Sequence, residues 1–250
     1  MDGFDGLEEK AHAYFRVKQQ ARETSLAHVR LLIRLSGNAI RAVHRRDWDG
    51  AGMLLAEARA EIEAIQNTLD GLPELYHHNY VGDALKEFAE ARLTLALVRD
   101  EVLPDPAGVG VGYVPYYNGL AEAVGELRRF SLDALRRGDL ATGERLLGAM
   151  DAIYELLVTI DYPDAVTGSL RRSTDGVRGI LERTRGDLTT AATQARLERL
   201  LSRAVPAMDS GHGEVLETAP RPSDDIVEDG APFIVDEVNE ANGEAAMVLP

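Results

Sequence analysis

Four glutamates stand at helical spacing in two segments of the chain. Glu87 and Glu90 are separated by three positions, and Glu122 and Glu126 by four, so the two carboxylates of each pair leave the same face of a helix. If the two helices pack side by side, the four side chains offer the oxygen ligands that Mg²⁺ or Mn²⁺ uses in phosphoryl chemistry. The pattern therefore predicts a metal site, provided that the two helices are neighbours.

The same spacing is common in glutamates that face water or pair with arginine. Glu122 and Glu126 continue to Arg129 on one helix face, which is typical of a solvated surface with ion pairs. Glu87 and Glu90 lie in a segment that is apolar around most of the helix, where a carboxylate needs a cation partner, either an arginine or a metal ion. Spacing alone favours the solvated or ion-paired interpretation.

The composition is that of an ordinary globular protein, because 250 residues with 45% hydrophobic content can bury one substantial core. The chain has no cysteine, which excludes disulfides, thiolate metal sites and a thiol nucleophile. No stretch approaches the roughly 18 apolar residues of a membrane span. Residues 1–9 are acidic where a secretory signal would be basic and then apolar. We therefore expect a cytoplasmic protein without a membrane partner.

Charge is spread unevenly along the chain. Of the net charge of -15, residues 206–250 contribute -10 and the preceding residues contribute -5. Only three of the 27 cationic residues are lysines, and the rest are arginines. This composition resembles that of halophilic proteins from salt-accumulating organisms such as haloarchaea. In molar salt the Debye length is about 3 Å, so phosphate binding would depend on short contacts such as arginine forks, stacking and metal bridges.

Apolar residues return every three or four positions from about residue 6 to residue 203, which predicts an all-α fold. Gly and Pro stop signals divide this pattern into a seven-helix bundle with short connections. The expected helices span 7–46, 51–69, 74–102, 115–137, 140–160, 164–185 and 188–204. Residues 206–250 have little periodicity, so we expect a helical domain over 1–205 and a disordered acidic tail over 206–250.

Three stretches of the sequence resemble the translin family. The main stretch is residues 116–131 (YYNGLAEAVGELRRFS), which is followed by Gly138-Asp139. The others are residues 170–178 (LRRSTDGVR), continuing to Glu182, and residues 40–45 (IRAVHR). The similarity covers roughly residues 22–200, and it implies a translin-like helical bundle that assembles into a homo-oligomer.

The acidic residues distinguish the two branches of this family. Translin itself binds single-stranded nucleic acid and lacks the carboxylate set, whereas translin-associated factor X supplies the ribonuclease site of an RNA-processing complex. Residues 85–91 (LKEFAEA) are similar to the factor-X segment that carries two catalytic acids, and Glu126 lies in the Gly-Glu-Leu motif shared by the family. Glu122 stands where factor X has a catalytic aspartate. Its extra methylene extends the carboxylate by about 1.5 Å, a displacement that can cost an active site about a hundredfold in rate.

The resemblance to factor X implies a metal-dependent endoribonuclease that acts on single-stranded RNA, with single-stranded DNA as a further ligand. Glu87, Glu90 and Glu122 would be the catalytic ligands of Mg²⁺ or Mn²⁺, and Glu126 a direct or indirect fourth ligand. We expect contacts to nucleic acid from arginines near the end of the first helix and along the sixth. These are Arg41, Arg45, Arg46, Arg171, Arg172 and Arg178.

The sequence leaves two other interpretations open. One is a non-catalytic oligomer that captures single-stranded RNA or DNA in a cavity, and the other is an acidic helical scaffold with no role in nucleic-acid binding. Binding of single strands without cleavage would support the first, and no binding at any salt concentration would support the second. The distance between the two glutamate pairs decides whether a metal site is possible at all.

Overall fold

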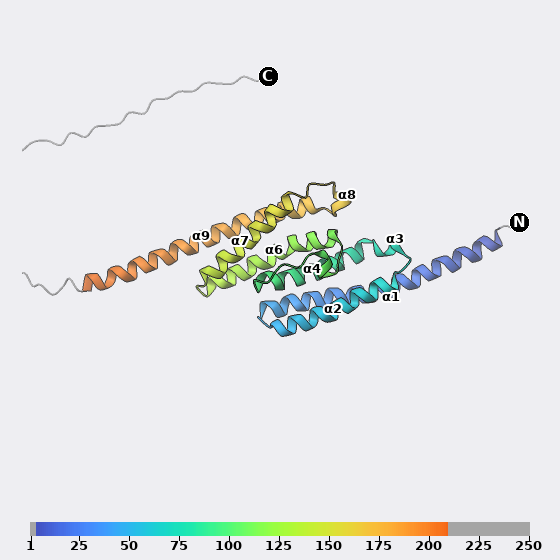
Figure 1. Ribbon diagram of the computed structural model, residues 1–250, viewed down its shortest axis with the longest axis horizontal. Helices are drawn as coiled ribbons and strands as arrows, with labels where there is room; N and C mark the ends of the chain where they lie inside the picture. The colour runs from blue at the N-terminus through green and yellow to red at the C-terminus, as the bar shows by residue number, and fades with distance from the viewer. Residues whose placement is uncertain (1–3, 210–250) are drawn as a thin grey trace, which may run out of the picture. The chain divides into compact units, whose positions relative to one another are not determined.

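The computed structural model in Figure 1 describes residues 4–209, without the side chains of residue 5 and residues 203–209. Within that range it contains helices and connecting loops and no strand, which confirms the predicted all-α class. The long helices are α1 (Asp5–His44), α2 (Trp48–Thr68), α4 (Asn79–Val98), α6 (Tyr113–Arg136), α7 (Leu140–Val158) and α9 (Leu170–Asp209). Three one-turn helices lie in the connections: α3 (Pro73–Tyr76), α5 (Pro106–Val109) and α8 (Asp164–Thr167).

The helix expected over 74–102 is divided in two, α3 and α4. The chain leaves the helical conformation at His78, where ψ is 148°. Pro73 is the first residue of α3. Proline is favoured at this position, because the first amide of a helix has no partner within the helix and proline has no amide hydrogen. The long helix that carries Glu87 and Glu90 therefore begins only two turns before them, at Asn79.

The prediction that Gly186 ends a helix is wrong, because α9 continues through it to Asp209. Leu181 and Leu188 are both buried, one on each side of the glycine, and their packing holds the helix together across it. The break falls earlier instead, at Gly168, whose φ of 62° is left-handed and ends α8.

The long helices pack as a series of neighbours in the order α2, α1, α4, α6 and α7, as the ribbon in Figure 1 shows. Helix α9 lies against α6 and α7, where Arg128 of α6 donates a hydrogen bond to Thr184. The core consists mainly of leucine, alanine, valine and isoleucine from facing helices. Asp47 and Asp139 cap the first turns of α2 and α7 by accepting backbone N–H bonds of 3.0 Å.

The predicted acidic tail falls largely on residues 210–250, which lie outside the described part of the chain. The proposed boundary between residues 205 and 206 remains a prediction. Among the helices that the structure describes, none has a stretch apolar and long enough to cross a membrane.

Candidate metal centre

The close approach of α4 and α6 places the glutamates of both helices side by side. At Gly119 the two backbones come so near that a β-carbon would lie 2.7 Å from the carbonyl oxygen of Lys86 and 2.9 Å from the amide nitrogen of Glu90. Only a residue without a side chain fits there. Glu122 follows Gly119 by one turn of α6, so its carboxylate projects toward the face of α4 that carries Glu87 and Glu90.

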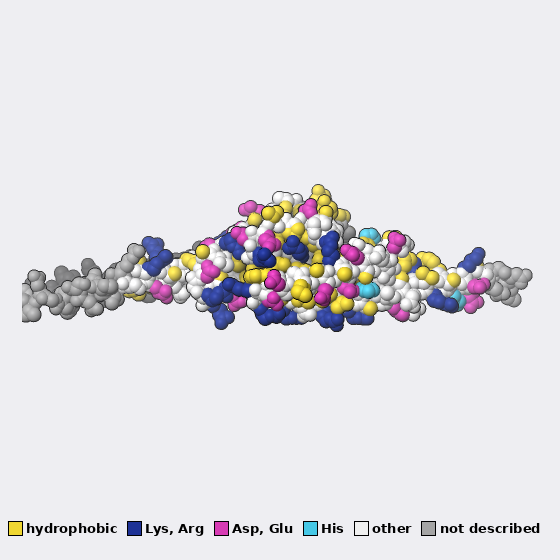
Figure 2. All heavy atoms as spheres, turned by 60° about the horizontal axis from the view of Figure 1, so that its bottom comes forward, with side chains coloured by type: hydrophobic (Ala, Val, Ile, Leu, Met, Phe, Trp, Pro, Cys, Tyr) yellow, Lys and Arg dark blue, Asp and Glu magenta, His cyan; other side chains and the backbone are white. Residues whose placement is uncertain are grey.

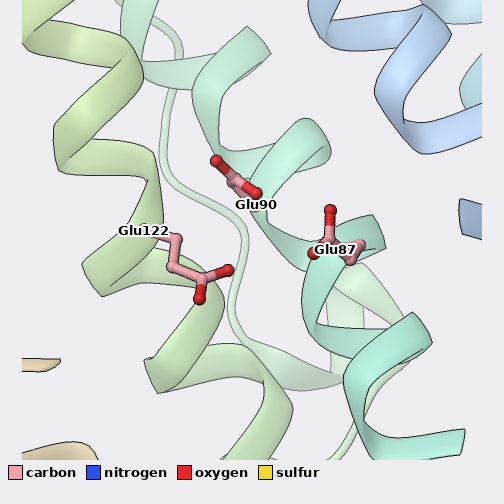
Figure 3. A group of neighbouring side chains, drawn as sticks. All are labelled: Glu87, Glu90 and Glu122. Atoms are coloured by element: carbon pink, nitrogen blue, oxygen red, sulfur yellow. The ribbon is translucent and has the colours of Figure 1, made fainter. Parts of the chain in front are cut away.

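Glu87, Glu90 and Glu122 form an acidic cluster in which one ligand oxygen from each residue lies within 4.8 Å of the other two. Figure 3 shows Glu122 reaching from α6 toward the two side chains of α4. Two oxygens bound to one Mg²⁺ ion at about 2.0–2.1 Å are at most about 4.2 Å apart, so at most a small side-chain movement separates the three oxygens from the spacing that a single ion requires. The three carboxylates can therefore hold a divalent cation, and each is only partly buried.

Burial and crowding of negative charge raise the pKa values of the two α4 glutamates. Burial is the largest cause at Glu90, followed by the charges of Glu122, Glu87 and Glu126, and together they raise its pKa to about 8. Burial and the charge of Glu122 also raise the pKa of Glu87. A cation placed among the carboxylates would lower both pKa values, because a nearby positive charge favours the ionised form.

Lys86 already supplies one positive charge to the cluster. Its Nζ donates a hydrogen bond of 2.7 Å to Oε1 of Glu122, and its charge opposes the rise in the pKa of Glu87. Of the three cluster glutamates, Glu122 is therefore ion-paired, as one of the two interpretations of the spacing expects. One lysine does not balance three carboxylates, so the cluster retains a negative charge when all three are ionised.

Glu126, the fourth predicted ligand, is bound elsewhere. Its Oε2 accepts a hydrogen bond from Nε2 of His44, the last residue of α1, and this bond holds the pKa of Glu126 below its usual range. The His44 ring stacks on Phe130 at 4.5 Å. Glu126 lies near enough to raise the pKa of Glu90 but outside the group of oxygens that can share one ion. It ties the end of α1 to α6.

No family model matches the chain, but individual known proteins are similar to it. The uncharacterized protein MJ0175 of Methanocaldococcus jannaschii is 34% identical over 193 residues, which is 76% of this chain and 85% of that protein. The crystal structure of AfC3PO and the structure of its complex with duplex RNA share 31% identity with this chain at a TM-score of 0.69. Each match covers 76% of this chain and at least 97% of the AfC3PO chain.

C3PO proteins of this kind are members of the translin family, and the match spans almost the whole of AfC3PO. The chain belongs to the translin family. The structure of apo-NeC3PO, with 22% identity and a TM-score of 0.62 over 76% of this chain and 98% of that one, shares the fold. The translin-like bundle expected from residues 40–45, 116–131 and 170–178 is thus confirmed.

The six predicted arginines lie on two separate parts of this translin-family chain, and all of them are exposed. Arg41, Arg45 and Arg46 stand at the end of α1, next to His44. Among the described side chains none of these three has a carboxylate partner within 4 Å. On α9, Arg171 pairs with Asp161 and Arg178 pairs with Glu182.

Figure 2 views the α1–α2 side of the molecule. Cationic side chains gather along the lower edge of the molecule in this view.

Three residues that organise the centre were not predicted from the sequence. The sequence did offer a reason to single out Lys86, because it is one of only three lysines in an arginine-rich chain. Gly119 lies within the family-like stretch, but its role depends on a contact with a helix about 30 residues earlier. His44 also lies in a family-like stretch, and its partner, Glu126, is 82 residues away.

Proposed function

We propose that this translin-family protein is a metal-dependent endoribonuclease of the factor-X branch. The acidic cluster between α4 and α6 carries this proposal, because it supplies three carboxylate oxygens close enough to share one ion. Translin itself lacks such a set, so the cluster is also the basis for choosing the factor-X branch. Glu122 extends across from α6 into the cluster, and its greater length relative to aspartate is compatible with a ligand role.

The cluster residues would bind Mg²⁺ or Mn²⁺ and hold it beside the phosphate that is cut. Bound there, such an ion lowers the pKa of water and offsets the charge that develops on the phosphate. Glu90 would release its proton when the ion binds, because its pKa of about 8 belongs to the metal-free site. Lys86 is the nearest cation to Glu122, so it would share that carboxylate with the ion or turn toward the phosphate.

RNA is the ligand that the comparisons support, since one AfC3PO structure is a complex with duplex RNA. We propose single-stranded RNA as the substrate that is cleaved, because a flexible strand can bring a phosphate to a half-buried cluster. Single-stranded DNA would bind through the same phosphate contacts. The arginines at the end of α1 are placed to guide the strand, since His44 holds this end against α6 one turn beyond Glu122.

We also propose that the protein forms a homo-oligomer. The first part of α1 exposes apolar side chains that no other described residue covers, among them Leu7, Tyr14 and Phe15, which are 54–64% exposed. Large exposed apolar groups along one helix are typical of surfaces that meet another protein. Light scattering after size-exclusion chromatography will report a mass that is a multiple of 27.3 kDa if this is correct.

The test is cleavage of labelled RNA by the purified full chain with and without Mg²⁺ or Mn²⁺. Glu87→Gln and Glu90→Gln should abolish metal-dependent hydrolysis, because each removes a charged ligand and leaves a side chain of the same size. Glu57→Gln on the exposed face of α2 is the matched control and should cleave as the wild type does. Single-stranded RNA, duplex RNA and single-stranded DNA are compared in parallel. Unchanged cleavage in both cluster variants would refute the proposed site.

The Lys86–Glu122 ion pair supports a second candidate, a binding protein without nuclease activity. Here Lys86 would be the permanent partner of Glu122, and the cluster would remain without a metal ion. Calorimetric titration with Mn²⁺ separates the two candidates. Saturable binding that Glu87→Gln removes supports the nuclease, whereas capture of single strands without metal binding or cleavage supports the binding protein.

A further inference from the structure

A pocket of about 440 Å³ adjoins the acidic cluster. Glu122 and Lys86 form the wall that the pocket shares with the cluster, and the beginning of α4, the beginning of α6 and the loop between α8 and α9 close it elsewhere. We call it the side pocket. Its volume lies within the range of small-molecule sites, about 300–1,000 Å³. A chain that presents a phosphate to the cluster would place its neighbouring nucleotide here.

The lining of the side pocket is hydroxylic and acidic. Ser169 and Ser173 face it from the α8–α9 loop and from α9, and Asp83 faces it from α4. Among the described side chains Asp83 has no cation within 4 Å, so both carboxylate oxygens are available as acceptors. No aromatic ring lines the pocket, so it offers no platform on which a base can stack. These groups suit the hydroxyls of a sugar better than the face of a base.

The pocket wall is fixed by hydrogen bonds around Asn118, one of which uses the hydroxyl hydrogen of Ser173. The buried Asn118 uses its side-chain nitrogen to donate to the carbonyl oxygens of Val114 and Thr167, at 3.0 and 2.9 Å. Its side-chain oxygen accepts a bond of 3.2 Å from Ser173. Asn118 is therefore saturated and holds α6, α8 and α9 together, whereas the Ser173 oxygen retains its capacity to accept.

The backbone at the loop is bent to form this wall. Gly168 and Ser169 both have left-handed φ values, of 62° and 67°. A β-carbon at position 168 would come within 2.9 Å of Val114, so the loop approaches α6 as closely as a glycine permits. A left-handed serine costs free energy, and such positions concentrate at functional sites. The loop presents the Ser169 side chain to the pocket in this conformation.

We propose that the side pocket binds the ribose next to the phosphate held at the cluster, and that contacts to the ribose 2′-hydroxyl make the protein select RNA over DNA. This inference rests on the proposed function, because it assumes that the cluster binds a phosphate through a metal ion. The 2′-hydroxyl both donates and accepts, so Asp83 can accept a hydrogen bond from it while the Ser169 hydroxyl donates one to its oxygen. A 2′-deoxyribose would leave these groups unpaired.

Two glycine variants test the pocket without touching a polar group. Gly82 lines the pocket, and nothing lies within 4 Å of a β-carbon added to it, so the side chain of Gly82→Leu would grow into the pocket space. Gly148→Leu on α7 is the matched control, because position 148 is also helical and also has nothing within 4 Å of an added β-carbon, but is not part of the pocket. Both changes replace glycine by a better helix former, which favours folding.

The experiment titrates the full chain with adenosine 5′-monophosphate and with its 2′-deoxy counterpart by calorimetry, in Mn²⁺ and in EDTA. The ribonucleotide should bind about tenfold more tightly in Mn²⁺, the difference that one hydrogen bond gives. Gly82→Leu should weaken its binding by about tenfold or more and leave Mn²⁺ affinity unchanged, while Gly148→Leu matches the wild type.

Equal affinity for the two nucleotides, no saturable binding in either condition, or the same result for both glycine variants overturns the proposal. Failure of the nuclease is recognised separately. If Mn²⁺ binds and the ribonucleotide is preferred but no RNA is cut, the pocket stands and the nuclease does not. If RNA is cut equally well with ribose and deoxyribose beside the scissile phosphate, the nuclease stands and the pocket does not.

Discussion

Lys86 Nζ lies 2.7 Å from Glu122 Oε1, so the carboxylate that completes the acidic cluster is already paired with a cation. The pair links α4 to α6 at the point where their backbones are closest. Burial and the charge of Glu122 raise the pKa values of Glu87 and Glu90, and Lys86 opposes that rise. A divalent cation entering the cluster would compete with Lys86 for Glu122.

Replacing Lys86 by methionine should therefore strengthen metal binding. Lys86→Met removes the competing charge and keeps a side chain of similar length, so we expect Mn²⁺ to bind about tenfold more tightly at pH 9. The high pH matters because Glu90 has then lost its proton, and the further rise in its pKa without Lys86 does not interfere. Calorimetric titration with Mn²⁺ gives the affinity.

Lys18→Met is the control for this change. Lys18 of α1 also pairs with a glutamate, Glu74 of α3. This pair lies on helices that carry no residue of the acidic cluster. The substitution should leave Mn²⁺ affinity unchanged. Weaker Mn²⁺ binding in Lys86→Met than in Lys18→Met would show that Lys86 supports the ligand set rather than competing with the ion.

Loss of the Glu90 proton should make the metal-free protein less stable at alkaline pH. Its pKa is about 8 in the native state and 4.5 as an ordinary glutamate, so the native state binds more protons between these values. The stability that protonated Glu90 contributes is fully present below about pH 4.5 and is lost as pH rises through about 8. Glu90→Gln removes this dependence and should be more stable than the wild type at pH 9 by on the order of 2 kcal/mol.

Denaturant unfolding in EDTA at several pH values measures this effect. Glu57→Gln makes the same chemical change at an exposed position of α2 and should retain the wild-type pH dependence. If Glu90→Gln and Glu57→Gln follow the same curve, Glu90 is not the group whose proton stabilises the site. The same proton should also limit metal binding, so wild-type Mn²⁺ affinity should rise with pH and level off above about 8.

The contact at Gly119 should couple the stability of the bundle to the metal site. A methyl group in Gly119→Ala would meet the backbone of Lys86 and Glu90, which cannot turn away as a flexible side chain does. We expect a loss of about 1–3 kcal/mol in the free energy of unfolding and a loss of about tenfold or more in Mn²⁺ affinity, because Glu122 moves away with α6.

Gly125→Ala tests the same substitution on the same helix without the contact. Nothing lies within 4 Å of a β-carbon at position 125, so alanine should stabilise α6 by about 0.5–1 kcal/mol through its helix propensity. Metal affinity should not change. Equal effects of the two alanines would mean that the approach of α4 and α6 at Gly119 does not position the cluster.

The helices were largely predictable because their signals are local. Apolar periodicity predicted the all-α class, and Asp139 and Gly138 marked the start of α7 correctly. Gly186 misled because a stop signal inside a helix is overridden when buried residues on both sides, Leu181 and Leu188, hold the helix in place. Helix propensities of neighbouring residues do not predict this packing between helices.

The candidate site was predictable only in part, because its geometry depends on contacts between distant residues. Helical spacing placed Glu87 and Glu90 on one face, and the family resemblance selected Glu122 as their companion. Glu126 shares the face of Glu122, yet His44 binds it, and that partner is 82 residues earlier in the chain. Periodicity shows which side chains share a face but not what lies opposite them.

The length of Glu122 is the feature that most directly tests the proposed activity of this site. The family resemblance places an aspartate at this position, and Glu122→Asp would restore it. In this structure the longer side chain spans the space from α6 to both α4 carboxylates and to Lys86. Shortening it by about 1.5 Å withdraws the carboxylate from both partners.

We therefore expect Glu122→Asp to bind Mn²⁺ about tenfold more weakly and to cleave RNA up to about a hundredfold more slowly. Glu122→Gln provides the comparison, because it keeps the length and loses the charge. If the site needs both the length and the charge of Glu122, Glu122→Asp and Glu122→Gln are both impaired. If Glu122→Asp is instead more active than the wild type, the native glutamate is too long for the site. The helices would then close on the ion by more than this metal-free arrangement indicates.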